Sequence, residues 1–196
     1  MKTTQILPEN YTEILTVDLQ KDKKLAIIVN ALAIVIGVLM FAVKCFFLPF
    51  FAIFDMSDGL FAYFARFGVL LLGMALYIIL HEAVHGVTMR LFGATHTRFG
   101  FTGIYAFAGS EKDYFGKWQY LTVALAPVLL FGVLFALLEL LLPLSAAWRW
   151  IIYVLQMINI SGAAGDLFVT LRFFTLPRSI LVRDTGVSMT VYAEKE

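Results

Sequence analysis

Four long apolar stretches dominate the pattern of hydrophobic and polar positions along the chain. They cover residues 25–43, 67–92, 120–142 and 150–176. A membrane-spanning helix needs about 20 predominantly apolar residues, and each stretch meets or approaches that length. The pattern therefore predicts an all-α integral membrane protein with four transmembrane helices, which form a single domain over residues 25–176. The polar residues 1–24 precede an apolar run too long for a cleaved signal peptide, so we expect a retained anchor.

Two shorter regions have the composition of β-hairpins. Residues 98–108 combine aromatic residues with glycines, and their apolarity predicts a hairpin that dips into the membrane. In lipid such a segment needs protein or a wet cavity to satisfy its backbone. Residues 180–192 contain two β-rich runs around a central Asp-Thr-Gly, which is consistent with a small hairpin. We expect this C-terminal tail, residues 177–196, to be a solvated appendage.

The positive charges flank the apolar stretches unevenly. Basic residues gather before the first stretch, between the second and the third, and after the fourth: Lys21, Lys23, Lys24, Arg90, Arg98, Lys112, Lys117, Arg172, Arg178 and Arg183. Cytoplasmic segments carry the excess of lysine and arginine in membrane proteins. Both termini are therefore expected in the cytoplasm.

Composition supports the membrane interpretation. Hydrophobic residues make up 61% of the 196 residues, and the mean hydropathy is +0.85. Soluble domains are only about 45–50% apolar. The formal net charge is +1 without a basic run, so we expect no nucleic-acid binding. Cys45 is the single cysteine, which excludes an intramolecular disulfide and indicates a packed thiol.

One motif within the second apolar stretch carries chemistry. Residues 80–86 read Leu-His-Glu-Ala-Val-His-Gly, which contains the pattern HExxH. Residues four apart lie on one face of a helix, so His81 and His85 can bind one zinc ion with Glu82 beside it. In this motif the glutamate is the general base, and it makes Glu82 the candidate catalytic residue.

A catalytic zinc site usually has a third protein ligand. Asp166 is the candidate, because a carboxylate deep in an apolar stretch is costly unless it is paired or bound to metal. Counted from the outer ends of their stretches, Asp166 and His81 lie at similar depth, and small residues 162–165 would permit close helix approach. A buried hydrogen bond between helices is the alternative role. Glu139, His96 and Asp184 are the other candidate ligands.

Asn159 lies seven residues before Asp166 and so near the same helix face. It could bind the backbone of a substrate or serve as a structural amide between helices. Both roles stay open.

These residues resemble the site-two protease class of intramembrane zinc metalloproteases, in which a later helix adds an aspartate to an HExxH. Asn159 and Asp166 match that second motif, although its proline is missing and Leu167 replaces a glycine. The chain is more similar still to a family of small bacterial membrane proteins described as zincin peptidases. The resemblance covers residues 75 to about 185. It implies a bacterial plasma-membrane protein, and it gives the hairpin at residues 98–108 a possible role as an edge strand that holds an extended substrate.

The leading hypothesis is a membrane-embedded zinc endopeptidase that cuts membrane-protein or peptide substrates in or near a transmembrane segment. The alternative is a non-catalytic membrane protein with a structural or metal-handling zinc site. Histidine and carboxylate ligands also accept other first-row metals. Specificity could come from the chain itself, from a homo-oligomer or from an adaptor protein.

Overall fold

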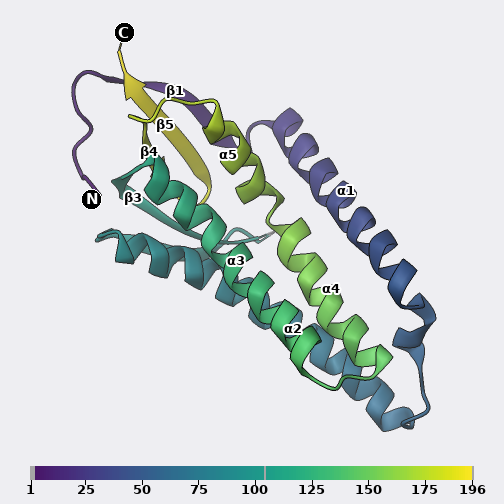
Figure 1. The fold of residues 1–196 in the computed structure, drawn as a ribbon. Helices are drawn as coiled ribbons and strands as arrows, with labels where there is room; N and C mark the ends of the chain where they lie inside the picture. The colour runs from purple at the N-terminus through teal and green to yellow at the C-terminus, as the bar shows by residue number, and fades with distance from the viewer. Residues whose placement is uncertain (1–2, 104, 196) are drawn as a thin grey trace. The chain divides into compact units, whose positions relative to one another are not determined.

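A computed structural model describes residues 3–103 and 105–195 of the chain. Within these residues, five α-helices and one short 3₁₀ helix form groups along the chain that are separated by strands, five in all (Figure 1). The helices are α1 (Lys23–Phe47), η1 (Phe50–Phe54), α2 (Leu60–Leu91), α3 (Lys117–Leu141), α4 (Ala146–Gly162) and α5 (Ala164–Phe174). The strands are β1 (Tyr11–Asp18), β2 (Thr97–Phe101), β3 (Ala106–Gly116), β4 (Leu181–Asp184) and β5 (Ser188–Glu194).

The strands form one antiparallel sheet, so the prediction of an all-α protein is wrong in this respect. Their order is β1-β5-β4-β3-β2, which makes β1 and β2 the two edges. The first and last strands pair along their length, from Tyr11 opposite Glu194 to Asp18 opposite Ser188. The all-α prediction failed because pairing between segments this far apart in sequence leaves no local pattern.

The predicted hairpin at residues 98–108 is present as β2 and β3, although β3 continues to Gly116. Gly103, with a φ of 93°, lies in the turn, and Ile104 beside it lies outside the described residues. The second hairpin is formed by β4 and β5. Its turn contains Gly186 with a φ of 82°, a conformation that glycine adopts without steric cost.

The chain divides into two compact units. The first contains Met1–Val29, Leu80–Pro127 and Gly165–Glu196, and the second contains Asn30–Ile79 and Val128–Ala164. The HExxH motif, Asp166 and the whole sheet belong to the first unit. Asn159 belongs to the second.

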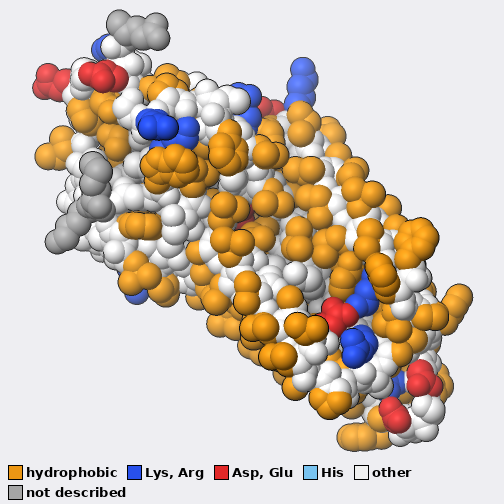
Figure 2. All heavy atoms as spheres, in the orientation of Figure 1, with side chains coloured by type: hydrophobic (Ala, Val, Ile, Leu, Met, Phe, Trp, Pro, Cys, Tyr) orange, Lys and Arg blue, Asp and Glu red, His pale blue; other side chains and the backbone are white. Residues whose placement is uncertain are grey.

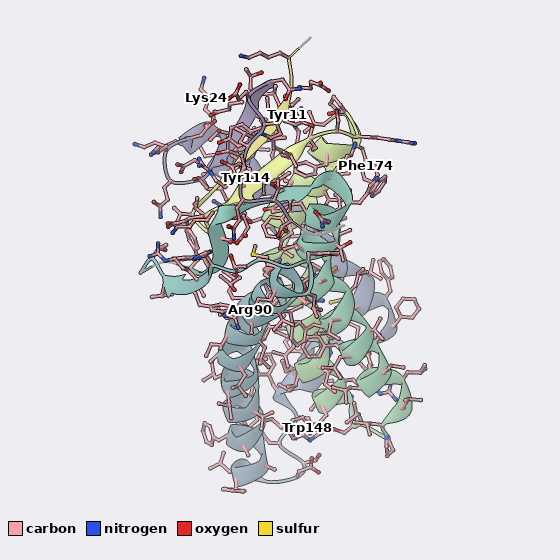
Figure 3. All side chains as sticks on the ribbon, turned by 90° about the vertical axis from the view of Figure 1, so that its left-hand side faces the viewer. Tyr11, Lys24, Arg90, Tyr114, Trp148 and Phe174 are labelled. Atoms are coloured by element: carbon pink, nitrogen blue, oxygen red, sulfur yellow. The ribbon has the colours of Figure 1, made fainter. Side chains whose placement is uncertain are left out.

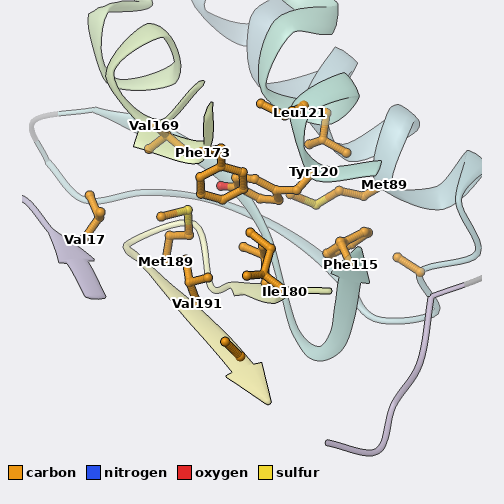
Figure 4. Close-up of a cluster of buried hydrophobic side chains, with 14 residues drawn as sticks. Val17, Met89, Phe115, Tyr120, Leu121, Val169, Phe173, Ile180, Met189 and Val191 are labelled. Atoms are coloured by element: carbon orange, nitrogen blue, oxygen red, sulfur yellow. The ribbon is translucent and has the colours of Figure 1, made fainter. Parts of the chain in front are cut away.

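The core of the first unit joins the sheet to parts of α2, α3 and α5 (Figure 4). Phe115 of β3 and Phe173 of α5 are fully buried in this cluster. Ile180, Val182 and Val191 from the C-terminal hairpin are equally buried in it. The expectation of a solvated C-terminal appendage is therefore wrong, because the apolar faces of β4 and β5 complete the core.

A smaller cluster stabilises the second unit. Ile53 of η1 packs there with Trp150 and Ile151 of α4. The indole Nε1 of Trp150 donates to the carbonyl of Pro49 at 2.9 Å. This bond satisfies the polar atom of a side chain that is otherwise completely buried.

Three helices, α1, α2 and α3, are long and apolar enough to cross a membrane, and the pair α4 and α5 would be a fourth span if it counts as one. The fourth stretch was expected as one helix, but it is broken at Ala163 and bent by 43°. Small residues around the break, Gly162 and Gly165 among them, disfavour a continuous helix.

Many large apolar side chains on these helices are exposed, and the space-filling view shows them crowding the visible surface (Figure 2). Examples are Ile34, Val38 and Leu39 on α1, Leu71, Leu72 and Ile79 on α2, and Leu130 and Val133 on α3. Soluble monomers rarely expose contiguous apolar patches of this kind, whereas lipid-facing helices do so as a rule.

Candidate metal centre

The HExxH motif lies within α2, so its two histidines project from successive turns of one helix. The Nε2 atoms of His81 and His85 lie 3.1 Å apart, and each residue is only 8% exposed. The helix therefore directs both imidazoles into the first unit with the same ring nitrogens facing each other.

Asp166 approaches the two imidazoles from the first turn of α5. Its Oδ2 lies 3.4 Å from Nε2 of His81 and 3.6 Å from Nε2 of His85. The break at Ala163 places this carboxylate at the start of a new helix, where the helix dipole favours negative charge. The structure thus brings together the three residues that the sequence nominated as metal ligands.

The spacing of these donors fits a zinc ion. Zinc bonds of about 2.0–2.2 Å in a tetrahedral arrangement place neighbouring ligand atoms roughly 3.3–3.6 Å apart. The three separations observed here are 3.1, 3.4 and 3.6 Å. Two imidazoles with one carboxylate are also the ligand chemistry of catalytic zinc sites. His81, His85 and Asp166 would therefore hold the ion.

Glu82 is half-buried beside this group. The backbone amide of Ala108 in β3 lies near its carboxylate. The hairpin therefore lies beside the residue that the motif assigns as general base.

Contacts between α2 and β2 hold the hairpin against the motif. A side chain at Gly86, directly after His85, would meet the ring of Phe99 in β2, so glycine permits the close approach. Arg90, in the last turn of α2 and labelled in Figure 3, donates from Nε to Oγ1 of Thr97 at 2.6 Å. Its guanidinium also lies over the ring of Phe99.

The second ring nitrogen of His85 has a backbone partner. Its Nδ1 lies 2.8 Å from the carbonyl oxygen of Val123 in α3. Sequence reasoning did not identify Val123, because a backbone acceptor can belong to any residue type. One signal was present, since Pro127 follows four residues later inside the same helix.

A cavity of about 170 Å³ adjoins Asp166. Most of its lining is apolar and comes from the β5 end of the sheet and from α5, including Val17, Phe168, Val187 and Met189. Tyr120 and Asp184 form its polar part, and the hydroxyl of Tyr120 donates to Oδ2 of Asp184 at 2.5 Å. Burial raises the pKa of the Asp184 carboxyl, although this hydrogen bond opposes the shift.

Asn159 is completely buried in the second unit. Its Oδ1 accepts from the hydroxyl of Tyr77 at 3.1 Å, and its Nδ2 donates to the carbonyl of Val128 at 3.1 Å. These contacts are those of an amide that links helices α2, α3 and α4. The role of Asn159 in substrate binding stays a prediction.

The other candidate ligands have partners of their own. Glu139 forms an ion pair with Lys44, and Asp184 is held by Tyr120 and by the backbone N–H of Gly186. His96 is exposed, and its Nδ1 is hydrogen-bonded to Thr95. Among the described residues, only His81, His85 and Asp166 form a group that could hold a metal ion.

The fold and the site define a helical protein in which an HExxH helix and a later aspartate form a candidate metal centre. A family model described as "putative zincin peptidase" matches residues 74–181. The match covers more than half of the chain, so the protein belongs to this family, which implies zinc and metallopeptidase chemistry. No curated protein and no solved structure matches the chain.

Proposed function

We propose that the protein is a membrane-embedded zinc endopeptidase that hydrolyses peptide bonds of membrane-protein substrates in or near a transmembrane segment. The observation that supports this most is the group of three zinc-type donors beside Glu82, two of which lie on α2, a helix apolar enough to span a membrane. Family membership supports the chemistry, and the exposed apolar helix surfaces support the location.

The roles of the residues follow from their positions. Zinc, when bound, acts as a Lewis acid that polarises a peptide carbonyl and acidifies water. The Glu82 carboxylate accepts a proton from the attacking water and gives it to the leaving amide nitrogen, so that the peptide bond is broken with no net change of protonation. His81, His85 and Asp166 would hold the ion beside Glu82.

The hairpin is the proposed substrate guide. A peptide bond inside an α-helix is hidden by its own hydrogen bonds, so a transmembrane substrate must be extended before cleavage. β2 is an edge of the sheet and can pair with an added strand, while β3 lies near Glu82. The largely apolar cavity next to Asp166 suits an apolar side chain of the substrate. Asn159 is proposed to act in substrate binding as well.

Metal analysis of the detergent-purified protein tests the site. We expect one zinc per chain in the wild type and in Glu82→Gln, and loss of zinc in His85→Ala and Asp166→Ala. Glu111→Gln is the matched control for the Glu82 substitution, because Glu111 is exposed on β3 and pairs with Arg98. Zinc binding indifferent to Asp166 would contradict the ligand set.

Activity is tested by comparing new protein N-termini in membranes of cells that produce wild type, Glu82→Gln or Glu111→Gln. Cleavage within or beside transmembrane segments should occur with the wild type and Glu111→Gln and be absent with Glu82→Gln. A structural zinc site needs no general base, so products that persist in Glu82→Gln would favour the non-catalytic alternative.

A further inference from the structure

The carbonyl of Val123 is deprived of its helical partner by the sequence itself. In an α-helix this oxygen would accept from the backbone N–H four residues later, which is position 127. Pro127 has no N–H, and a proline ring inside a helix also crowds the carbonyl four residues before it. Val123 is 1% exposed, and a buried carbonyl without a hydrogen-bond partner is costly, so a donor other than the N–H of residue 127 is expected.

His85 supplies that donor. Its Nδ1 lies 2.8 Å from the Val123 oxygen, and both residues are buried. A carbonyl oxygen can only accept, so the hydrogen bond requires the proton on Nδ1. In a neutral imidazole the Nε2 lone pair is then free to bind a metal, and Nε2 is the atom that faces His81 and Asp166.

We propose that Pro127 is a positioning residue of the metal centre. By removing one hydrogen bond from α3 it reserves the Val123 carbonyl for His85, which fixes both the tautomer and the ring orientation of this ligand. The proposal rests on the zinc site of the proposed function. It assigns a role to a residue that is itself neither a metal donor nor the general base.

A proline that merely bends α3 would have a different signature. If Pro127 only bent α3, the hydrogen bond between the freed Val123 carbonyl and His85 would have no effect on metal binding. Restoring an N–H at position 127 would then change the helix without changing the metal site. Under the present proposal the restored N–H competes for the same oxygen and loosens His85.

The test compares zinc affinity in the full-length protein, measured by competition with a fluorescent zinc chelator. Loss of such an outer partner typically weakens metal binding about 10–100-fold, and we expect that range for Pro127→Ala. Pro143→Ala is the matched control, because Pro143 follows the end of α3 and lies outside the helix. It should bind zinc like the wild type.

Nitrogen-15 NMR of the histidines in the wild type gives a second readout that needs no variant to fold. The expected result is a proton on Nδ1 of His85, and the Nε2–H tautomer would overturn the proposal. Unchanged zinc affinity in a folded Pro127→Ala would overturn it as well. A wild type without zinc would contradict the proposed function, whereas a zinc-loaded wild type with an indifferent Pro127 contradicts only this inference.

Discussion

At the scale of single residues, the site follows from the cost of placing polar groups among apolar ones. The HExxH spacing identified His81 and His85, and the expense of a buried carboxylate identified Asp166, which the structure places 3.4 Å and 3.6 Å from them. The partner of His85 could not be predicted, because the carbonyl of Val123 becomes an acceptor only through the packing of α3 against α2.

Placing charged groups among apolar residues is also costly for Lys44 and Glu139 in the second unit, and the two side chains pair with each other. Their ion pair joins α1 to α3, and the ammonium also lies 4.5 Å from the ring centre of Tyr153. The side chains are only 11% and 23% exposed. Sequence analysis named Glu139 only as a candidate metal ligand and did not predict this partner, since no local pattern connects residues so far apart in sequence.

Removing one member of this pair should destabilise the protein strongly. We expect Lys44→Met to lower the free energy of unfolding by about 1–3 kcal/mol, because it leaves the partly buried Glu139 carboxylate without a counter-charge. The double variant Lys44→Met/Glu139→Leu should recover most of that loss. Unfolding in detergent measures both, and a double variant less stable than Lys44→Met would contradict this account.

At the scale of elements, the four apolar stretches became helices, and both β-rich regions became hairpins. β1 was missed because its residues, Tyr-Thr-Glu-Ile-Leu-Thr-Val-Asp, carry no strict alternation and its partner β5 is at the other end of the sequence. The sheet therefore exists through long-range pairing, which a local pattern cannot report.

One glycine controls how closely the two hairpins approach. A side chain at Gly109 of β3 would meet the backbone of Thr185 and Gly186 in the turn between β4 and β5. We expect Gly109→Ala to lower the free energy of unfolding by about 1–3 kcal/mol, since backbone cannot give way as a flexible side chain can. Thermal unfolding of the purified protein measures the effect.

Gly68→Ala is the control for this substitution. Gly68 lies in α2, and an added methyl group there would meet no atom within 4 Å. Alanine also favours a helix over glycine, so stability should be unchanged or raised. Equal stability of the two variants would show that the close approach of the β4–β5 turn does not require glycine at position 109.

At the scale of the whole molecule, the sheet restricts how the chain can cross a bilayer. β1 precedes α1, the β2–β3 hairpin lies between α2 and α3, and β4 and β5 follow α5. Paired strands must lie on one side of a membrane, so each set of intervening helices must cross it an even number of times. With α1, α2 and α3 as spans, the broken pair of α4 and α5 must be the fourth.

Thiol labelling of reconstituted or cellular protein tests whether the number of membrane crossings between the paired strands is even. In a Cys45→Ser background, single cysteines at Glu9 and Lys195 should react from one side of the membrane, and cysteines at Met56 and Ser145 from the other. From the positive-inside rule we expect the first side to be the cytoplasm. Permeabilised membranes, in which all four positions should react, are the control. Labelling of Glu9 and Lys195 from opposite sides would rule out the sheet as described.

The pairing of β1 with β5 also sets an order of events during synthesis. β1 emerges from the ribosome before α1, yet its partner is complete only at Glu194, after α5 has been made. Until then β1 has no neighbour in the sheet, because it lies at the edge and pairs with β5 alone. Asp166 likewise emerges long after the two histidines. A nascent chain that contains only α1 and α2 therefore has neither its metal centre nor its sheet, and the proposed peptidase activity can begin only after Asp166 has joined His81 and His85.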